Sequence, residues 1–390
     1  MSVTRCDIFC KVIDNYGDIG VCWRLARQLA AEQGLAVRLW VDDLASFARL
    51  APALDASAAQ QRLADLDICR WDGAAASATP ADIVIEAFAC DPPAAYVEAM
   101  AKRPRKPAWI NLEYLSAEGW VEGSHGLPSP HPRLPLVKHF FFPGFTPATG
   151  GLIREKGLID RLRAFQADAA SQAAFWQRIA GQAPAAGALS ISLFAYENAA
   201  LPGLLDAWAS GERNIFCAVT SGRHLPQVDA WLASRGAAGC GKLQLAFLPF
   251  LDQGDYDHLL AACALNFVRG EDSFVRAQWA GRPFVWHIYR QEEDWHRVKL
   301  DAFLHRYGAS SGTAGMRALK DFWQAWERES DAGGQWPALL AALPELAAHA
   351  ASWQQKLAED TDLASKLLIF CQNLLECAAF PKAATGASGN

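Results

Sequence analysis

The sequence predicts an α/β protein with two doubly wound, Rossmann-like domains, and three observations support this fold class. The chain has 390 residues, a length that suits two domains of roughly 100–200 residues each. Short β-branched or aromatic segments alternate with amphipathic helical segments in two separate series, as expected for parallel sheets with crossover helices. The breaker-rich segment GQAPAAG lies between the two series and marks a domain boundary.

The first series predicts an N-terminal domain over residues 1–150. Its first strand, CDIFCKVI, leads through the turn DNYGDIG into a helix that ends near residue 33. The other segments with strand character are 36–41, 67–71, 82–88, 107–113 and 138–145. We expect these strands to form a parallel sheet. Residues 151–188 are then expected to be a linker region that contains a helix.

The second series predicts a C-terminal domain over 189–344. Its expected strands are 189–196, 214–220, 242–250, 264–270 and 283–289. An amphipathic helix is predicted over 345–378, where it is placed to pack back on the first domain, and the tail 379–390 is expected to be disordered. Ligands bind beyond the carboxyl ends of strands in doubly wound sheets. We therefore expect the two domains to face each other across a cleft that holds the active site.

Composition narrows the class of protein and its partners. Apolar residues make up 52% of the chain and charged residues 20%, which excludes a disordered or fibrous chain. The net charge of −6 offers no basic surface for a phosphate backbone, so nucleic acid is not an expected partner. No signal peptide and no membrane-spanning run is recognised, which predicts a cytoplasmic protein without a membrane partner. The ten cysteines form no CxxC pair, and we expect small buried hydrophobes instead of metal ligands.

The first strand-to-helix turn carries two carboxylates, Asp14 and Asp18, around Asn15, Tyr16 and Gly17. A dinucleotide fingerprint needs GxGxxG, whereas this turn offers only GxxG, and its carboxylates would repel a phosphate. The turn is therefore predicted to present a base or a cation-binding group. The alternative is that both aspartates are turn and N-cap residues.

The second domain has a comparable turn over residues 269–274. Arg269, a glycine and a helix N-terminus converge there, which suits a diphosphate held by backbone N–H groups. The alternative is an ordinary helix start with Asp272 or Ser273 as the N-cap. Two aromatic residues, Phe194 and Phe250, follow strands of this domain and are placed either to stack a nucleobase or to fill the core.

Three further features have weaker interpretations. The DxD triplets at 65–67 and 255–257 are compatible with a metal site, but neither follows a predicted strand, so no catalytic metal is predicted. His287 and His296 are too far apart for a helical metal pair, and their polar surroundings suit a solvated helix start. The long loop over 113–135 is either a functional loop or a cover for the sheet edge.

These motifs together carry a family resemblance. The segments DNYGDIGVCWRLARQL, NLEYLSAEGWVE, SPHP, FFPGF and RGEDSFVRAQWAGRPFVWHIY resemble the protein-arginine rhamnosyltransferases that mature bacterial translation elongation factor P. The similarity runs from the first strand to about residue 375. It implies a GT-B glycosyltransferase that moves L-rhamnose from dTDP-β-L-rhamnose to one arginine of elongation factor P. The family's reaction is inverting and needs neither a metal nor a cofactor beyond the donor.

The resemblance also implies site residues. The family's essential carboxylates match Asp14, Asp18 and Glu271, and its two base-stacking aromatics match Phe194 and Phe250. Other family contacts to nucleotide, sugar or phosphate match Tyr196, Gln253, Arg269, Asp272, Ser273 and Tyr289. We add Asn15, Tyr16 and Gly17 to the donor-binding set, and Glu113 and Tyr114 as candidates for contact with the acceptor.

The chemistry is compatible with these assignments. Guanidinium is protonated at neutral pH and must be oriented and lose a proton as the C–N bond forms. A carboxylate does both, so Asp18 is expected to be the general base and Asp14 to hold the loop or the guanidinium. Glu271 is expected to contact ribose or acceptor, because phosphate would repel it. Two alternatives remain: a nucleotide-sugar transferase with a glycan or lipid acceptor, and a two-lobed small-ligand binding protein.

Overall fold

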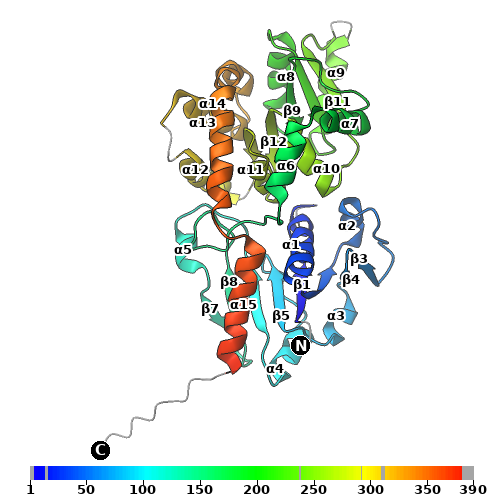
Figure 1. The fold of residues 1–390 in the computed structure, drawn as a ribbon, viewed down its shortest axis with the longest axis vertical. Helices are drawn as coiled ribbons and strands as arrows, with labels where there is room; N and C mark the ends of the chain where they lie inside the picture. Colours follow the sequence, from blue (N-terminus) through cyan, green and yellow to red (C-terminus); the bar gives the residue numbers. More distant parts are fainter. Residues whose placement is uncertain (1–3, 14–15, 237–238, 291, 309–311, 380–390) are drawn as a thin grey trace, which may run out of the picture. The chain divides into compact units, whose positions relative to one another are not determined.

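The protein forms two compact units, each with its own sheet (Figure 1). The structure, a computed structural model, describes residues 4–13, 16–236, 239–290, 292–308 and 312–379. Unit 1 comprises the described residues up to Ile153 together with those from Thr361 onward, and unit 2 comprises Arg154–Asp360. The chain therefore leaves the first unit, forms the second and returns.

Unit 1 contains an eight-stranded sheet in the order β3-β4-β2-β1-β5-β6-β8-β7. The strands are β1 (Arg5–Cys10), β2 (Ala36–Val41), β3 (Gln60–Leu63), β4 (Leu66–Arg70), β5 (Ile83–Ala87), β6 (Ala108–Leu112), β7 (Pro128–Pro130) and β8 (Val137–Phe141). The six strands that the sequence predicts pair in parallel. The prediction of a purely parallel sheet is wrong at both edges, because β3 and β7 pair antiparallel and are too short and too polar or proline-rich to resemble core strands.

Helices cover both faces of this sheet. They are α1 (Gly17–Gln33), α2 (Leu44–Leu50), α3 (Gly73–Ser77), α4 (Ala94–Lys102), α5 (Trp120–Ser124) and α15 (Leu363–Ala379). On one face, Ile8 and Ile110 pack with residues of α1 and α15, which lie side by side in Figure 1. On the other face, Phe9 and Trp109 pack with Tyr96 of α4. Side chains alternate along each strand, so successive residues pack into the cores on opposite faces of the sheet.

The C-terminal helices differ from the predicted single helix over 345–378. Residues up to Ala358 belong to α14 (Ala332–Ala358) of unit 2, whereas α15 belongs to unit 1. The break falls where Leu363 N donates to Leu152 O (2.9 Å), which ties the start of α15 to unit 1. An amphipathic pattern continues through such a break, so periodicity does not reveal it. The predicted disordered tail lies outside the described residues except for residue 379, the last of α15.

Unit 2 contains a five-stranded, all-parallel sheet in the order β11-β10-β9-β12-β13. Its strands are β9 (Leu189–Leu193), β10 (Ile215–Val219), β11 (Leu243–Phe247), β12 (Leu265–Arg269) and β13 (Phe284–His287). Its other helical segments are α6 (Leu158–Ala167), α7 (Ala169–Ala180), α8 (Leu201–Ser210), α9 (Leu225–Arg235), α10 (Gln253–Ala262), α11 (Asp272–Ala280), the 3₁₀ turn η2 (Glu292–Asp294), α12 (Trp295–Gly308) and α13 (Ala314–Glu327). All five strands fall where the sequence predicts them.

The predicted linker region over 151–188 forms two helices of unit 2. Asp168 caps α7 by accepting from Ala170 N and Ser171 N, and Trp176 of α7 packs edge-on against Phe216 of β10 (5.3 Å between ring centroids). Phe175, Trp176 and Ile179 of α7 are buried in one core cluster with Phe216 of β10, and α6 packs against α7, α10 and α11. The domain boundary therefore falls at 153–154 and not across a connecting helix.

Cysteines are mostly core residues. Seven of the ten are buried and all ten are free thiols, and burial raises the pKa of the Cys217 thiol far above its usual value. A protonated, buried thiol is neither nucleophile nor metal ligand, which agrees with the interpretation of these residues as small hydrophobes.

Candidate active site

The first turn of α1 holds Asp18 in a defined orientation. Helix α1 begins after Tyr16, which is the N-cap and makes no side-chain cap hydrogen bond. Asp18 follows in the first turn and is 2% exposed. Its Oδ2 accepts from Ile13 N (2.8 Å) and its Oδ1 from the Tyr114 hydroxyl (3.0 Å). The alternative interpretation of Asp18 as an N-cap is therefore wrong, although the positive end of the helix dipole still favours its charge.

Asp14 and Asn15 lie outside the described residues. The predicted roles of these two residues, one as a second carboxylate and the other as a donor contact, stay predictions. Tyr16 and Gly17 are described and are half-buried at the start of α1.

Strand order brings the acceptor candidates beside Asp18. Tyr114 follows β6 and stacks on Phe88, which follows β5, with 4.2 Å between ring centroids. Glu113 Oε1 accepts from Asn111 Nδ2 (2.6 Å), and Glu113 N donates to Phe141 O at the end of β8 (3.0 Å). Asp18, Glu113 and Tyr114 therefore lie along one edge of the sheet, beyond the carboxyl ends of its strands.

The backbone after β5 is strained at the point that supports Tyr114. Phe88 has φ of 58° and Ala89 has φ of 55°, a left-handed conformation that is uncommon for residues other than glycine. Phe88 N donates to Leu112 O (2.7 Å) and Ala89 N to Asn111 Oδ1 (3.0 Å). These bonds hold the turn so that the Phe88 ring lies against Tyr114. Strain of this kind concentrates at functional sites.

In unit 2, Arg269 lies against two aromatic rings at the carboxyl end of β12. Its guanidinium carbon is 4.5 Å from the centroid of the Phe194 ring and 4.6 Å from that of Tyr196. The residue is 7% exposed. Such cation–π contacts are strengthened when the cation is desolvated. Strands β9 and β12 are neighbours in the sheet, which explains why residues that follow them meet.

The start of α11 leaves its N-terminal turn without a side-chain cap. Glu271 is the N-cap and makes no side-chain cap hydrogen bond, so the alternative with Asp272 or Ser273 as N-cap is wrong. Ser273 Oγ instead accepts from Arg269 N (3.1 Å) and donates to Arg269 O, across Gly270 with φ of 64°. Gln253 Nε2 donates to Asp272 Oδ2 (3.4 Å). A tight turn before a helix N-terminus is a favourable place for an anion.

A pocket of about 500 Å³ lies beside these residues. Its lining residues are Tyr196, Glu197, Asn198, Ala199, Arg223, Gln227, His287, Tyr289, Arg290 and Glu329. The Tyr196 ring packs edge-on against His287 (5.2 Å between centroids) and against Tyr289 (5.6 Å). Two of the predicted donor residues, Tyr196 and Tyr289, therefore share one cavity.

Two buried histidines support this pocket. His287 Nδ1 accepts from Tyr196 N (3.3 Å), and His224 Nδ1 lies 3.0 Å from Ala195 O. Burial is the main cause that lowers the pKa of His287 to about 3 and that of His224 to about 4, and nearby Arg269 lowers both further. Both rings are therefore neutral near pH 7. The predicted solvated helix start is wrong for His287, which ends the buried strand β13 and is 3% exposed, and for His296, which is also 3% exposed. The usable signal for His287 is a histidine at the end of a buried strand.

The two predicted base-stacking aromatics have different surroundings. Phe194 contacts Arg269 and packs edge-on against Tyr256 of α10 (5.7 Å between centroids). Phe250 follows β11 and is half-buried. Both rings belong to unit 2, but the sandwich of a base between them stays a prediction.

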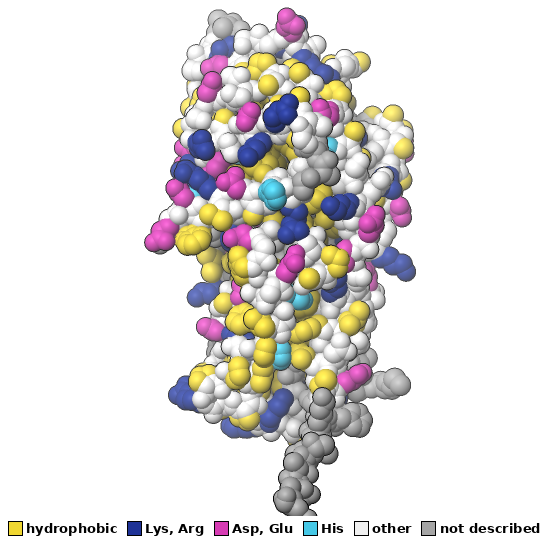
Figure 2. Space-filling view, turned by 90° about the vertical axis from the view of Figure 1, so that its left-hand side faces the viewer, with side chains coloured by type: hydrophobic (Ala, Val, Ile, Leu, Met, Phe, Trp, Pro, Cys, Tyr) yellow, Lys and Arg dark blue, Asp and Glu magenta, His cyan; other side chains and the backbone are white. Residues whose placement is uncertain are grey.

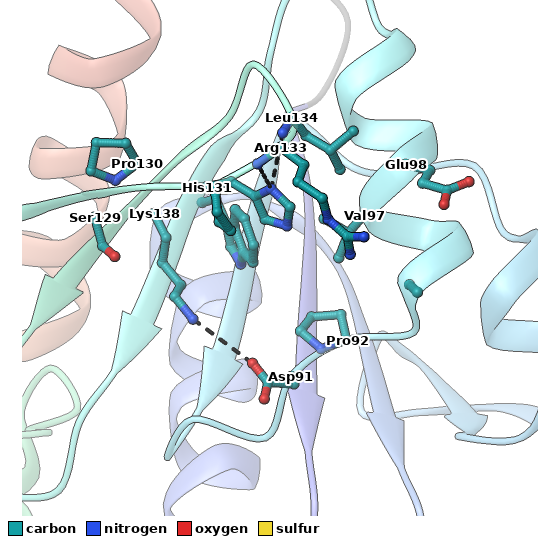
Figure 3. Close-up of a pocket in the computed structure, with 13 residues that line it drawn as sticks. Asp91, Pro92, Val97, Glu98, Ser129, Pro130, His131, Arg133, Leu134 and Lys138 are labelled. Carbon is teal, nitrogen blue, oxygen red and sulfur yellow. Dashed lines mark hydrogen bonds and ion pairs between the residues drawn. The ribbon is translucent and has the colours of Figure 1, made fainter.

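A second pocket, of about 520 Å³, lies in unit 1 between the start of α4, the loop 129–134 and the sheet (Figure 3). Lys138 forms an ion pair with the buried Glu86, lies 3.9 Å from Asp91 and sits over the Trp109 ring. Burial raises the pKa of Glu86 despite this partner. None of the predicted catalytic or binding residues lines this pocket.

The DxD triplet at 255–257 is engaged in structural ion pairs. Asp255 forms a two-pronged ion pair with Arg178 (2.6 and 2.7 Å), and Asp257 pairs with the buried Arg276 in the same way. Asp65 is exposed, 3.8 Å from Arg62. Within the described residues, no group of three or more His, Cys, Asp and Glu side chains is arranged to hold a metal ion.

None of the helices in the described parts of the chain is both long and apolar enough to span a membrane.

Two domains with mainly parallel, doubly wound sheets are the fold class of GT-B glycosyltransferases, and a buried carboxylate at the first helix and an aromatic and arginine pocket suit this class. A solved structure has the same fold: MurG of Acinetobacter baumannii is 14% identical, covers 95% of this chain and 100% of its own, and has a TM-score of 0.52. The chain belongs to the elongation factor P (EF-P) rhamnosyltransferase EarP family, whose sequence model matches residues 6–372.

Curated relatives agree with this family. The protein-arginine rhamnosyltransferase of Pseudomonas putida is 51% identical over 95% of this chain and 99% of its own length. That of Pseudomonas aeruginosa is 48% identical over 93% and 98%. A solved structure described as the structural basis for EarP-mediated arginine glycosylation of translation elongation factor EF-P is 38% identical, covers 95% and 99%, and has a TM-score of 0.66.

Proposed function

We propose that this protein transfers L-rhamnose from dTDP-β-L-rhamnose to an arginine side chain of translation elongation factor P, in the cytoplasm and with inversion at the anomeric carbon. Family membership supports the activity. The observation that carries the mechanism is the carboxylate of Asp18, which is 2% exposed and fixed by Ile13 N and the Tyr114 hydroxyl.

Asp18 acts as the general base. A guanidinium nitrogen attacks the anomeric carbon, the bond from that carbon to the diphosphate oxygen breaks, and Asp18 takes the proton that the nitrogen releases. A fixed carboxylate is suited to this step because it orients the guanidinium by charge-assisted hydrogen bonds. Asp14 helps to hold the first turn or the guanidinium. Glu113 and Tyr114, which lie beside Asp18, contact the acceptor.

Unit 2 binds the donor. Phe194 and Phe250 stack the thymine, while Arg269 and the uncapped start of α11 face the diphosphate and stabilise the departing charge. The other donor contacts are Tyr196, Gln253, Asp272, Ser273, Tyr289 and, from the first turn of unit 1, Asn15, Tyr16 and Gly17. Glu271 contacts ribose or acceptor. Direct displacement requires no protein nucleophile, and the donor is the only other small molecule in the proposed reaction.

The test is incubation of the purified protein with dTDP-β-L-rhamnose and folded elongation factor P, followed by intact-mass spectrometry. We expect one added deoxyhexose, located on an arginine by fragmentation, and an α anomeric linkage by NMR. The acceptor with that arginine changed to lysine is the control and should stay unmodified. A folded acceptor that gains no mass contradicts the activity, and a β linkage contradicts inversion.

A further inference from the structure

An acidic and aromatic segment runs from Asp18 along the carboxyl edge of the sheet in unit 1. Residues 113–127 contain three glutamates, Glu113, Glu118 and Glu122, and neither lysine nor arginine. Two large aromatic side chains of this segment are exposed, Tyr114 at 38% and Trp120 at 53%. Figure 2 shows hydrophobic side chains gathered over this unit, on the face that carries α5, β7 and β8. Exposed aromatics of this kind mark interaction surfaces.

Strand order sets the direction of this surface. The neighbouring strands β1, β5, β6 and β8 are followed respectively by Asp18, by Phe88, by Glu113 with Tyr114, and by Phe142. Trp120 packs edge-on against Phe142 (5.4 Å between centroids). Adjacent strands are about 4.8 Å apart, so the row from Asp18 to Phe142 spans about 14 Å. An ordinary protein interface that buries about 800 Å² on each partner is about 30 Å across, so this row spans about half of one and is longer than a single side chain.

Trp120 combines a contact inside the protein with an exposed surface, as a residue that anchors an interface does. One side of its indole rests on Phe142, and about half of the side chain faces solvent. Phe142 is in turn 8% exposed, and its N–H donates to His125 Nδ1 (3.1 Å). Tryptophan has only two side-chain torsions and so loses little entropy on binding, and it is enriched among residues that dominate binding energy.

We propose that Tyr114, Glu118, Trp120 and Glu122, here called the docking strip, bind the folded surface of the acceptor protein around its target arginine. The inference rests on the proposed function and names the partner surface for the same site. The charge of the strip indicates which partner binds it. The strip is negatively charged and lies beside Asp18, so it favours a basic protein surface around an arginine. Recognition over about 14 Å, three strand spacings, reaches beyond the target guanidinium to neighbouring residues of the acceptor.

Steady-state kinetics with varied elongation factor P tests the strip. We expect Trp120→Ala to raise the KM for the acceptor about tenfold, with kcat and the Kd for the donor unchanged. Ile369→Ala is the matched control, because Ile369 is 54% exposed in the same unit but lies on α15. The thermal midpoint is measured for both, and Trp120→Phe, which keeps a ring on Phe142, should recover part of the loss.

The charge of the strip is tested separately. We expect Glu122→Lys to raise the acceptor KM at low salt and to lose much of that effect at high salt, because salt screens exposed charges. Glu98→Lys on α4, which changes the charge of the same unit by the same amount at another exposed position, should leave the KM unchanged. An unaltered KM in both Trp120→Ala and Glu122→Lys overturns the proposal. A wild-type protein that does not modify the acceptor at all overturns the proposed function instead, so the two failures are distinguishable.

Discussion

At the scale of single residues, Asp18 is distinguished by how it is held. Its two carboxylate oxygens accept from a backbone N–H five residues earlier and from a hydroxyl 96 residues later. These two bonds hold the carboxylate in one orientation. A base that is aimed in advance loses no reorganisation energy during the reaction.

The first prediction concerns this residue. We expect Asp18→Asn to lower kcat by at least about 10²-fold, since general bases contribute roughly 10²–10⁴-fold, while the Kd for dTDP stays within about twofold. Mass spectrometry measures the transfer and calorimetry the binding. Loss of dTDP binding in this variant would place Asp18 in the donor site and contradict its role as base.

A second prediction concerns the donor pocket. Phe194→Ala should weaken binding of dTDP by roughly 5- to 150-fold, the equivalent of 1–3 kcal/mol for a lost aromatic stack. Phe194→Leu, which keeps most of the volume without the π face, should lose nearly as much, whereas Phe194→Tyr should bind almost normally. If all three variants bind dTDP with the wild-type Kd, Phe194 only fills the core beside Arg269.

Buried charges show what sequence alone does not reveal at this scale. Asp7 lies in the apolar strand β1 and is 1% exposed, yet it forms a two-pronged ion pair with Arg38 of β2 (2.7 and 2.6 Å). The partner is 31 residues away, and only the parallel pairing of β1 with β2, in which Asp7 lies opposite Arg38, brings the two together. The hydrophobic periodicity within a short window of sequence does not predict an ion pair between residues so far apart.

At the scale of elements, α15 completes the core of a unit that the chain has already left. Leu363, Leu367 and Cys371 are at most 2% exposed and pack in the same cluster as residues of β1, β5 and α1. The helix thus fills a face of the sheet that crossover helices leave open. Unit 1 therefore depends on residues at both ends of the described chain.

The third prediction follows from this packing. Leu367→Ala should destabilise unit 1 by about 2–5 kcal/mol, because it opens a cavity in a well-packed core. Hydrogen exchange should show faster exchange in the amides of β1 and β6 and no change in β9 or β12. Ile369→Ala, on the exposed side of the same helix, should stay within about 0.5 kcal/mol of the wild type. Equal effects of the two variants would mean that α15 does not pack as described.

At the scale of the whole molecule, pH should act through the two neutral histidines of unit 2. His287 and His224 have folded-state pKa values of about 3 and about 4, below the ordinary value near 6.5. Below pH 6.5 these two histidines are therefore protonated in the unfolded chain but stay neutral in the folded chain. Stability should fall as the pH drops from about 6.5 to 4, by roughly 3 kcal/mol for each histidine.

Chemical denaturation between pH 4 and pH 7.5 checks this fourth prediction. The double variant His224→Gln, His287→Gln should lose much of the slope of unfolding free energy against pH in this window. His305→Gln, at an exposed position, is the control. Because Tyr196 and Ala195 contact these rings, donor binding should weaken over the same window. A slope that survives in the double variant would assign the pH dependence to carboxylates instead.

The sequence by itself determined the alternation of strands and helices, the two-domain class and the turns that carry Asp18 and Arg269. These features follow from local periodicity and from residue types at strand ends, which a short window of sequence contains. Tertiary structure alone decided that Tyr114 donates to Asp18, that Arg269 lies against Phe194 and Tyr196, and that α15 returns to unit 1. The reason is physical: these contacts depend on which strands become neighbours, and strand order is set by packing of the whole chain.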